Sequence, residues 1–285
     1  MSIDALLREL REDTVHGASW YFLKGIELVS LALSSGFDPG RIRALINELR
    51  GVRPGMAPII NLVYIIEQAI NRGLDISDVI NKLREAYSRI RERMIEQLGK
   101  YAIRCGSSVI TISYSSAVRA ALEQWGSCFD SLIIMESRPG NEVFQAVKDY
   151  SRFVNTIKVI PDSAVASFIE RGVDYAVVGA DGLYTDGYFL NKVGTETLLI
   201  TAREFDVKTI VVAESYKAAV GGIDEVYTVD FAVGDVITEV PLFDKVPLDL
   251  VDHLITDVGI IKRPRAEDVE NVREAFIESV LGPGG

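Results

Sequence analysis

The fold is decided by residues 175–200, YAVVGADGLYTDGYFLNKVGTETLLI. A short apolar run comes first, and a polar segment that contains several glycines follows it. A second apolar pattern, with the spacing of a helix, begins after NKVGT at 191–195. A buried strand, a polar turn and an amphipathic helix are the repeating unit of a parallel α/β sheet. The stretch therefore predicts a β–α unit, with Asn191 and Lys192 opening the helix.

Further apolar runs of the same kind lie on both sides of this stretch. They are SVITIS (108–113), SLIIM (131–135), TIKVI (156–160) and TIVVA (209–213). Turn residues bound each run, and an amphipathic segment follows it. Unbroken rather than alternating hydrophobicity is typical of strands that are covered on both faces. We therefore expect an α/β domain over residues 105–285, built on a doubly wound, mainly parallel sheet.

The residues before position 105 have a different pattern. Apolar residues recur there at helical spacing, and no strand pattern is present. Asp38 followed by Pro39 is typical of a helix start, and Asp75 precedes a long apolar helical pattern. The pattern predicts a helical domain, a bundle of about four or five helices, over residues 1–104.

Composition excludes several classes of protein. The chain has 285 residues, of which 48% are hydrophobic and 25% charged, as in folded globular proteins. No apolar run approaches the roughly 18 residues of a membrane span, and the N-terminus has no signal-peptide pattern, so we expect no membrane association. The net charge of −11 argues against direct nucleic-acid binding.

The cysteines and histidines are too few and too scattered for a zinc site. Cys105 and Cys128 form no CxxC pair, and His16 and His253 are the only histidines. We expect no metal, no cofactor and no disulfide, and hence an intracellular, cytoplasmic protein. His16 is expected to be structural or exposed, and His253 to lie in an amphipathic helix.

Polar side chains follow each of the predicted strands. In parallel sheets, ligands bind beyond the carboxyl ends of the strands, where these side chains would meet. Arg138, Lys192 and Lys217 would supply positive charge there, and helix starts would supply N–H groups. The set predicts a site for a phosphorylated small molecule. The residues after the strands are Ser113, Ser115, Glu136, Arg138, Asp162, Asp181, Glu214 and Lys217.

Each of these residues also has a simpler explanation when taken alone. Ser115, Asp162 and Asp181 could cap helices or form turns. Arg138 could pair at the surface with a neighbouring glutamate, and Lys217 could be solvated. The site hypothesis rests on the coincidence of such residues at all five strand ends.

An ordered set of short motifs resembles one protein family. The motifs are ESRP (136–139), DSA (162–164), GAD (179–181), DG (186–187), NKVGT (191–195), AESYK (213–217) and PLFD with ITDVGI (241–260). The chain resembles the family that unites the alpha, beta and delta subunits of eukaryotic translation initiation factor 2B with two isomerases. These isomerases act on methylthioribose-1-phosphate and ribose-1,5-bisphosphate. The resemblance covers nearly the whole chain and implies a helical N-terminal domain, a Rossmann-like C-terminal domain and a homodimer or higher oligomer.

The resemblance also implies roles for individual residues. The isomerases use a cysteine and an aspartate as an acid–base pair, and Asp181 falls on the aspartate position. Ser113 falls on the cysteine position, and a hydroxyl does not ionise near neutral pH without an adjacent base. Neither cysteine can substitute, because both precede their strands and should lie at the opposite edge. The ligand-binding residues implied are Arg53 (of Arg53-Pro54-Gly55), Ser115, Arg138, Asn191, Lys192 and Lys217.

A second departure concerns Glu142, which stands where the isomerases have a glutamine. A carboxylate there would repel a substrate phosphate unless it were protonated or paired with Arg138. AESYK and ITDVG are closer to the initiation-factor alpha subunit, whereas Asp181 is closer to the isomerases.

Two functional hypotheses therefore stay open. The first is a regulatory or binding protein with a sugar-phosphate or nucleotide pocket, and with an initiation factor 2 subunit as a candidate partner. The second is an isomerase that converts an aldose-1-phosphate to a ketose with Asp181 and with Ser113 in place of the thiol.

Overall fold

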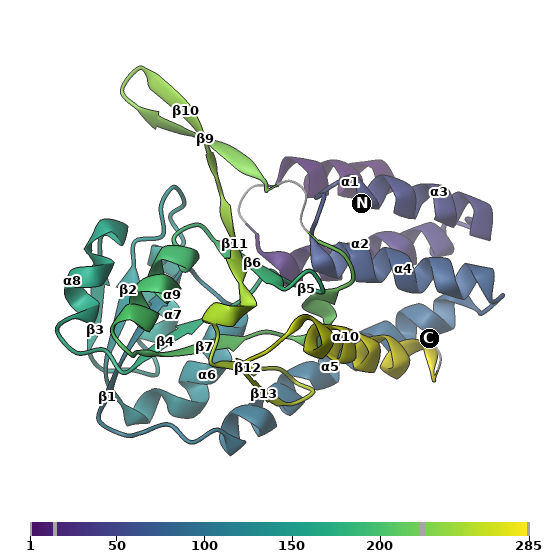
Figure 1. Cartoon of the computed structure of the whole chain (residues 1–285). Coiled ribbons are helices and arrows are strands. Elements are labelled where there is room, and N and C mark those ends of the chain that lie inside the picture. Colours follow the sequence, from purple (N-terminus) through teal and green to yellow (C-terminus); the bar gives the residue numbers. More distant parts are fainter. Residues whose placement is uncertain (1, 14–15, 223–225, 284–285) are drawn as a thin grey trace.

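The computed structural model describes residues 2–13, 16–222 and 226–283 (Figure 1). The predicted N-terminal helices are confirmed. They are α1 (Ile3–Glu12), α2 (Ala18–Ser34), α3 (Pro39–Arg50), α4 (Ala57–Asn71) and α5 (Ile76–Lys100). The carboxylate of Asp38 caps α3 by accepting from the Arg41 N–H at 2.9 Å, and Asp75 caps α5 through the Ser77 N–H at 2.8 Å.

The predicted parallel sheet is also confirmed. Its strands are β1 (Ser107–Ile112), β2 (Phe129–Met135), β3 (Ile157–Ile160), β4 (Tyr175–Val178), β7 (Lys208–Val212), β12 (His253–Ile255) and β13 (Ile260–Lys262). They lie in the order β13-β12-β7-β4-β1-β2-β3, and β13 alone of this sheet is antiparallel to its neighbour. The chain order reverses between β1 and β4, so these two strands flank the switch point at which such sheets bind ligands.

Helices cover both faces of this sheet, as the unbroken apolar runs predict. Ile110 and Ile112 of β1 belong to one hydrophobic cluster, with α8 (Val165–Ile169) and α9 (Thr195–Glu204). Val109 belongs to another, with α6 (Ser116–Trp125) and α7 (Val143–Tyr150). The last helix, α10 (Ala266–Leu281), packs partly against α5 and α4.

A second, smaller sheet corrects the placement of Asn191 and Lys192. Its strands are β5 (Gly182–Tyr184), β6 (Tyr188–Lys192), β8 (Ala218–Ala219) and β11 (Phe243–Pro247), in the order β11-β6-β5-β8. Both residues lie in β6, and α9 begins only at Thr195. The prediction that they open the helix was wrong because β11, some fifty residues further along, pairs with β6 and extends it.

His253 also lies in a strand, and the expected helix around it was wrong. It begins β12, which pairs with β7 on one side and β13 on the other. Inter-strand bonding outweighs the local helical spacing there. His16 is exposed, as expected, and its Nδ1 lies 2.6 Å from a carboxylate oxygen of Asp13.

The cysteines form a disulfide between Cys105 and Cys128, contrary to the sequence expectation. They precede β1 and β2, which are parallel neighbours, so the two strand starts lie side by side at the amino edge of the sheet. The Gly106 N–H donates to the Cys128 carbonyl at 2.9 Å. The expectation of an intracellular location was based on the absence of a disulfide, and the Cys105–Cys128 bond removes that basis. In the described ranges, no helix has the length and apolar character that crossing a membrane requires.

A hairpin projects from the rest of the molecule (Figure 1). It consists of β9 (Thr228–Val233) and β10 (Val236–Pro241), which form a two-stranded sheet within the described residues. We refer to residues 228–241 as the arm. Its tip carries large exposed apolar side chains: Val233, Val236 and Ile237 are each about two-thirds exposed, at 65–67%.

Candidate functional site

The candidate site lies at the carboxyl edge of the large sheet, where β1 and β4 end side by side. Ser115 follows β1 and touches the end of β4 so closely that any side chain at Gly179 would overlap its hydroxyl. Ser115 also caps α6, because its Oγ accepts from the Val118 N–H at 3.3 Å. Ser115 is therefore both the N-cap of α6 and a residue at the switch point between β1 and β4.

Asp181 follows β4 and faces the start of α2. A Cβ atom at Gly17, the N-cap of α2, would lie 3.8 Å from its Oδ1, and the nearby backbone N–H of Ala18 favours the charged form of the carboxylate. The positive end of the α2 dipole thus points at this acid. Burial raises the pKa of Asp181, while Lys217 and the Ala18 N–H oppose that rise only in part.

Lys217 is 4% exposed and pairs with Glu214, with 2.9 Å between Nζ and Oε2. Burial alone would lower the pKa of Lys217, but the carboxylates of Glu214 and Asp181 outweigh it and raise the pKa. The Ser116 hydroxyl donates to the other oxygen of Glu214 at 3.3 Å. We refer to Asp181, Glu214, Lys217 and Ser116 as the Lys217 cluster.

Lys192 is 2% exposed, and its Nζ lies 2.9 Å from Oε1 of Glu142. The suggested pairing of Glu142 with Arg138 is therefore replaced by a pairing with Lys192. The second oxygen of Glu142, Oε2, is buried and accepts no hydrogen bond within the described ranges. Adjacent Asn191 points to the opposite face of β6, and its Nδ2 donates to the Thr195 hydroxyl at 2.9 Å. Lys192 and Asn191 therefore point to opposite faces of β6 and contact different groups.

The loops after β1 and β2 are tied together by their backbones. Ser113 and Ser137 both have left-handed φ angles, at 64° and 66°, and the Ser113 N–H donates to the Ser137 hydroxyl at 2.7 Å. The Asp162 carboxylate accepts from the backbone N–H groups of Ser137 and Arg138, both at 2.8 Å. Asp162 is thus a loop anchor. No hydrogen bond within the described ranges joins the Ser113 hydroxyl to an acid, a lysine or a histidine.

Arg138 stays at the surface, where one nitrogen lies 3.6 Å from Glu136 and another donates to Asn141 at 3.0 Å. The simpler explanation, pairing with Glu136, holds for it. Across the part of the chain that the structure describes, no ion pair joins Arg138 to the Lys217 cluster or to Glu142.

Arg53 lies in the loop between α3 and α4, in the helical region. Its Nε donates to the Tyr21 hydroxyl at 2.9 Å, and its guanidinium lies 4.4 Å from the centre of the Tyr227 ring. The Tyr184 hydroxyl donates to the Gly55 carbonyl, which holds the Arg53 loop beside β5 and thus beside Asp181. Among the described residues, Arg53 has no carboxylate within 4.0 Å, whereas Arg138, Lys192 and Lys217 each have one.

One contributor was not among the residues predicted at the strand ends, and another, Glu214, was placed there without its role as the partner of Lys217. The start of α2 at Gly17 and Ala18 gives no sequence signal, because only the tertiary fold brings it to Asp181. Glu214 stands three residues before Lys217, and that spacing alone could have indicated the pair.

Replacing Asp181 by asparagine is expected to stabilise the protein at alkaline pH. An acid whose pKa is raised by folding stabilises the folded state only below its unfolded pKa, and this contribution is lost as the pH rises through the folded value. Urea unfolding at pH 4, 6 and 8 should therefore show that the free energy of unfolding of the variant, relative to that of the wild type, increases as the pH rises. The exposed Asp235→Asn is the control and should show no such trend. A variant that is less stable than the wild type at pH 8 would contradict this prediction.

Over most of its length, the chain is similar to proteins of one known family. Residues 21–263 match the model of the initiation factor 2 subunit family. A protein of Pyrococcus horikoshii described as translation initiation factor eIF-2B subunit 2-like is 32% identical over 91% of this chain and 96% of its own length. The ribose 1,5-bisphosphate isomerase of Methanocaldococcus jannaschii is 27% identical over 78% of this chain and 77% of its own.

Solved structures agree with these sequence relationships. The crystal structure of Pyrococcus horikoshii translation initiation factor eIF-2B superposes with a TM-score of 0.77 at 26% identity, covering 94% of this chain and 98% of that one. The 5-methylthioribose 1-phosphate isomerase of the same organism superposes with a TM-score of 0.71 at 20% identity, covering 96% and 88%. At that identity, the second likeness shows the fold alone.

Proposed function

Because the chain belongs to the initiation factor 2 subunit family, we propose that it is a binding member that holds a sugar phosphate or nucleotide without converting it. The observation that carries the proposal is the surroundings of Ser113. An acid–base isomerase needs two proton-transferring groups, and Asp181 with its raised pKa is only one of them. In the described structure, the Ser113 hydroxyl has no base that could activate it.

The charges of the site support ligand binding. Of the four cations predicted for this site, Arg53 has no carboxylate within 4.0 Å among the described residues, so it is the group best placed to attract a phosphate. The Oε2 of Glu142 is buried against Gly140 and accepts no hydrogen bond within the described ranges, so a sugar hydroxyl would reach it only after the loop around Gly140 moves. The same carboxylate neutralises Lys192, so Lys192 contributes less to phosphate binding than its burial near Asp181 suggests.

An isomerase is the second candidate, and Asp181 favours it. Conversion of an aldose-1-phosphate to a ketose moves a proton between neighbouring carbons, and a carboxyl with a raised pKa can carry that proton. Several relatives with this activity share 27–31% of their residues with this chain over the aligned segments. The missing element is the second group, at Ser113.

Substrate turnover separates the two candidates. Wild-type protein incubated with ribose-1,5-bisphosphate or methylthioribose-1-phosphate is expected to form no ketose, as followed by NMR. Ser113→Cys is expected to raise turnover by about 100-fold or more over background, because a thiol can act as an acid–base group near neutral pH. Adding Asp181→Asn should abolish that gain.

The control for this experiment is Ser88→Cys, which places a thiol on the exposed surface of α5, away from the Lys217 cluster. It should stay inactive. Wild-type turnover that Asp181→Asn removes would overturn the binding proposal in favour of the isomerase. If neither substrate is converted and calorimetry detects no binding of either, the pocket itself is refuted.

A homodimer formed through the arm is the second part of the proposal. On one face of the arm, Val229, Phe231 and Val233 oppose Val240, Thr238 and Val236. This face is apolar, whereas the other face places Asp230 opposite Glu239. An isolated two-stranded hairpin is marginally stable in water, so a covering surface is expected, and we assign it to a second copy of the chain.

Introducing charge into the apolar face of the arm is expected to convert dimer to monomer. Light scattering should give about twice 31.4 kDa for the wild type and 31.4 kDa for Val233→Asp/Val236→Asp. The double variant Thr228→Asp/Ala232→Asp changes the opposite face by the same charge and should stay dimeric. A monomeric wild type would exclude the homodimer, and a dimer in both variants would exclude the arm as its interface.

A further inference from the structure

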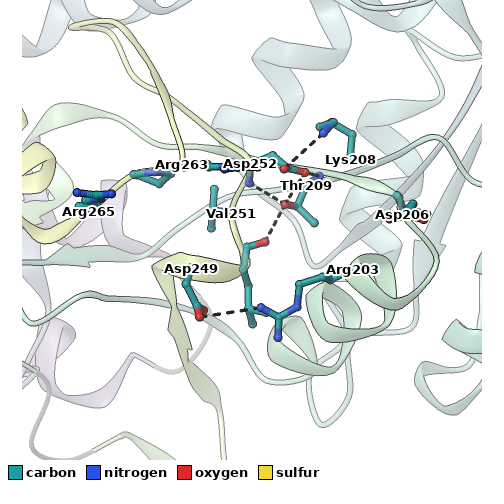
Figure 2. Close-up of a pocket in the computed structure, with 12 residues that line it drawn as sticks. Arg203, Asp206, Lys208, Thr209, Asp249, Val251, Asp252, Arg263 and Arg265 are labelled. Carbon is teal, nitrogen blue, oxygen red and sulfur yellow. Dashed lines mark hydrogen bonds and ion pairs between the residues drawn. The ribbon is translucent and has the colours of Figure 1, made fainter.

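A cavity of about 470 Å³ opens at the amino edge of the sheet, away from the site described above (Figure 2). Its walls come from the end of α9, the start of β7, residues 249–252 before β12, and residues 263–265 before α10. The volume lies within the roughly 300–1,000 Å³ of small-molecule pockets. Residues 208–212 of β7 span about 16 Å, so the cavity and the Lys217 cluster lie at opposite ends of that strand.

Positive charge exceeds negative charge around this cavity. The cationic residues are Arg203, Lys208, Arg263 and Arg265, and the acidic residues are Asp206, Asp249 and Asp252. This excess is notable in a chain with a net charge of −11.

The carboxylate of Asp252 already has hydrogen-bond and ion-pair partners within the protein. Its Oδ2 accepts from the N–H of Thr209 at 3.0 Å and from the hydroxyl of Thr209 at 3.3 Å. Its Oδ1 lies 3.4 Å from Nζ of Lys208. This carboxylate therefore fixes the start of β7 and leaves little capacity for a further cation.

Asp249 binds Arg203 only loosely. The closest nitrogen–oxygen distance is 4.0 Å, and both side chains are mostly exposed. A surface pair of this kind contributes about 0–1 kcal/mol, so an incoming anion could displace it at low cost.

Arg263 and Arg265 are the unpaired cations of the cavity. Neither guanidinium has a carboxylate within 4.0 Å in the ranges that the structure describes, and the two residues line the cavity on the same side of the view in Figure 2. Arg263 has a left-handed φ of 51°, which is unfavourable for a residue with a side chain. Its N–H donates to the Asp252 carbonyl at 2.8 Å, which holds the loop in that conformation.

We infer that this cavity binds a small phosphorylated molecule, with its phosphate between Arg263 and Arg265. Guanidinium groups match phosphate oxygens in pairs, and two of them on one side of a cavity form a fork for this anion. Val207, Leu250, Val251 and Pro264 offer apolar surface to the rest of the ligand. This site is separate from the one proposed at the carboxyl edge, and it goes beyond the proposed function.

Calorimetric titration with inorganic pyrophosphate tests the inference on the intact protein. Arg263→Ala and Arg265→Ala are each expected to weaken binding at least tenfold, because each removes a charge-assisted hydrogen bond. Arg263→Lys and Arg265→Lys should retain part of the affinity. Hydrogen exchange should show protection at residues 206–210 and 249–265 when pyrophosphate binds.

The control is Lys82→Ala/Lys148→Ala, which removes two exposed positive charges from α5 and α7. It should bind pyrophosphate like the wild type, whereas Arg263→Ala/Arg265→Ala should not bind at this cavity. Arg53→Ala, at the carboxyl edge, should leave the protection at residues 249–265 unchanged. No binding by the wild type, or equal losses in the two double variants, would overturn the inference without touching the proposed function.

Discussion

Replacing Lys217 by methionine is expected to lower the free energy of unfolding by about 3–5 kcal/mol at pH 7. Lys217 is 4% exposed and lies between the carboxylates of Glu214 and Asp181. Removing the cation would leave two partly or fully buried acids without their counter-charge. Urea unfolding followed by circular dichroism measures the loss.

Two further variants separate this effect from lost packing. Lys208→Met breaks a more exposed pair with Asp252, at 3.4 Å, and should cost less than about 1 kcal/mol. Adding Glu214→Gln to Lys217→Met should restore most of the loss, because one uncompensated charge disappears. If the double variant is as unstable as Lys217→Met, the ion pair is not the source of the stability.

The Lys217→Met variant should also gain stability on acidification. Burial raises the pKa of Asp181 and Lys217 opposes that rise, so without the cation the folded protein binds the Asp181 proton still more tightly than the unfolded chain does. Its deficit relative to the wild type should therefore shrink between pH 7 and pH 5. A deficit that is constant across this range would argue against an electrostatic cause.

Replacing Phe22 by alanine is expected to cost about 3–5 kcal/mol. Phe22 is fully buried in α2 and stacks on Tyr216 with 4.7 Å between ring centres. It also meets Tyr87 of α5 and Phe276 of α10. These rings join the N-terminal helices to the segment after β7 that carries Tyr216 and Lys217. The variant should therefore be less stable, and Lys217 should no longer be held in its place. Thermal and urea unfolding report the first, and ligand titration the second.

The control for Phe22 is Phe144→Ala, whose side chain is 75% exposed on α7. Its truncation should change the free energy of unfolding by no more than about 0.5 kcal/mol. A loss at Phe22 no larger than the loss at Phe144 would show that the aromatic cluster does not stabilise the junction.

Taken together, the charged groups of the candidate site add little net stability, although removing one partner of a pair alone is costly. Buried ion pairs are often no better for stability than apolar residues of the same volume, because desolvation offsets their attraction. Asp181, Lys217 and the unsatisfied Oε2 of Glu142 are therefore hard to explain by folding alone. Their retention at a switch point is what a binding site requires.

The sequence alone determined the elements that depend on local pattern. The five apolar runs became β1, β2, β3, β4 and β7 because strands buried on both faces need unbroken hydrophobicity. Asp38 and Asp75 cap helices as their spacing predicts. Positions after the strands met at one edge because parallel strands end on the same side, which placed Ser115 against β4 and Asp181 at the switch point.

Only the tertiary structure decided the pairings between distant segments. Lys192 lies in β6 because β11 pairs with it, and it meets Glu142, fifty residues earlier, rather than a phosphate-binding helix start. Cys105 and Cys128 met because β1 and β2 are neighbours. The start of α2 reached Asp181 only through the packing of the helices on the sheet. Local pattern sets which segments form strands and helices, but strand order and packing set which charges meet, and those meetings decide the chemistry of the site.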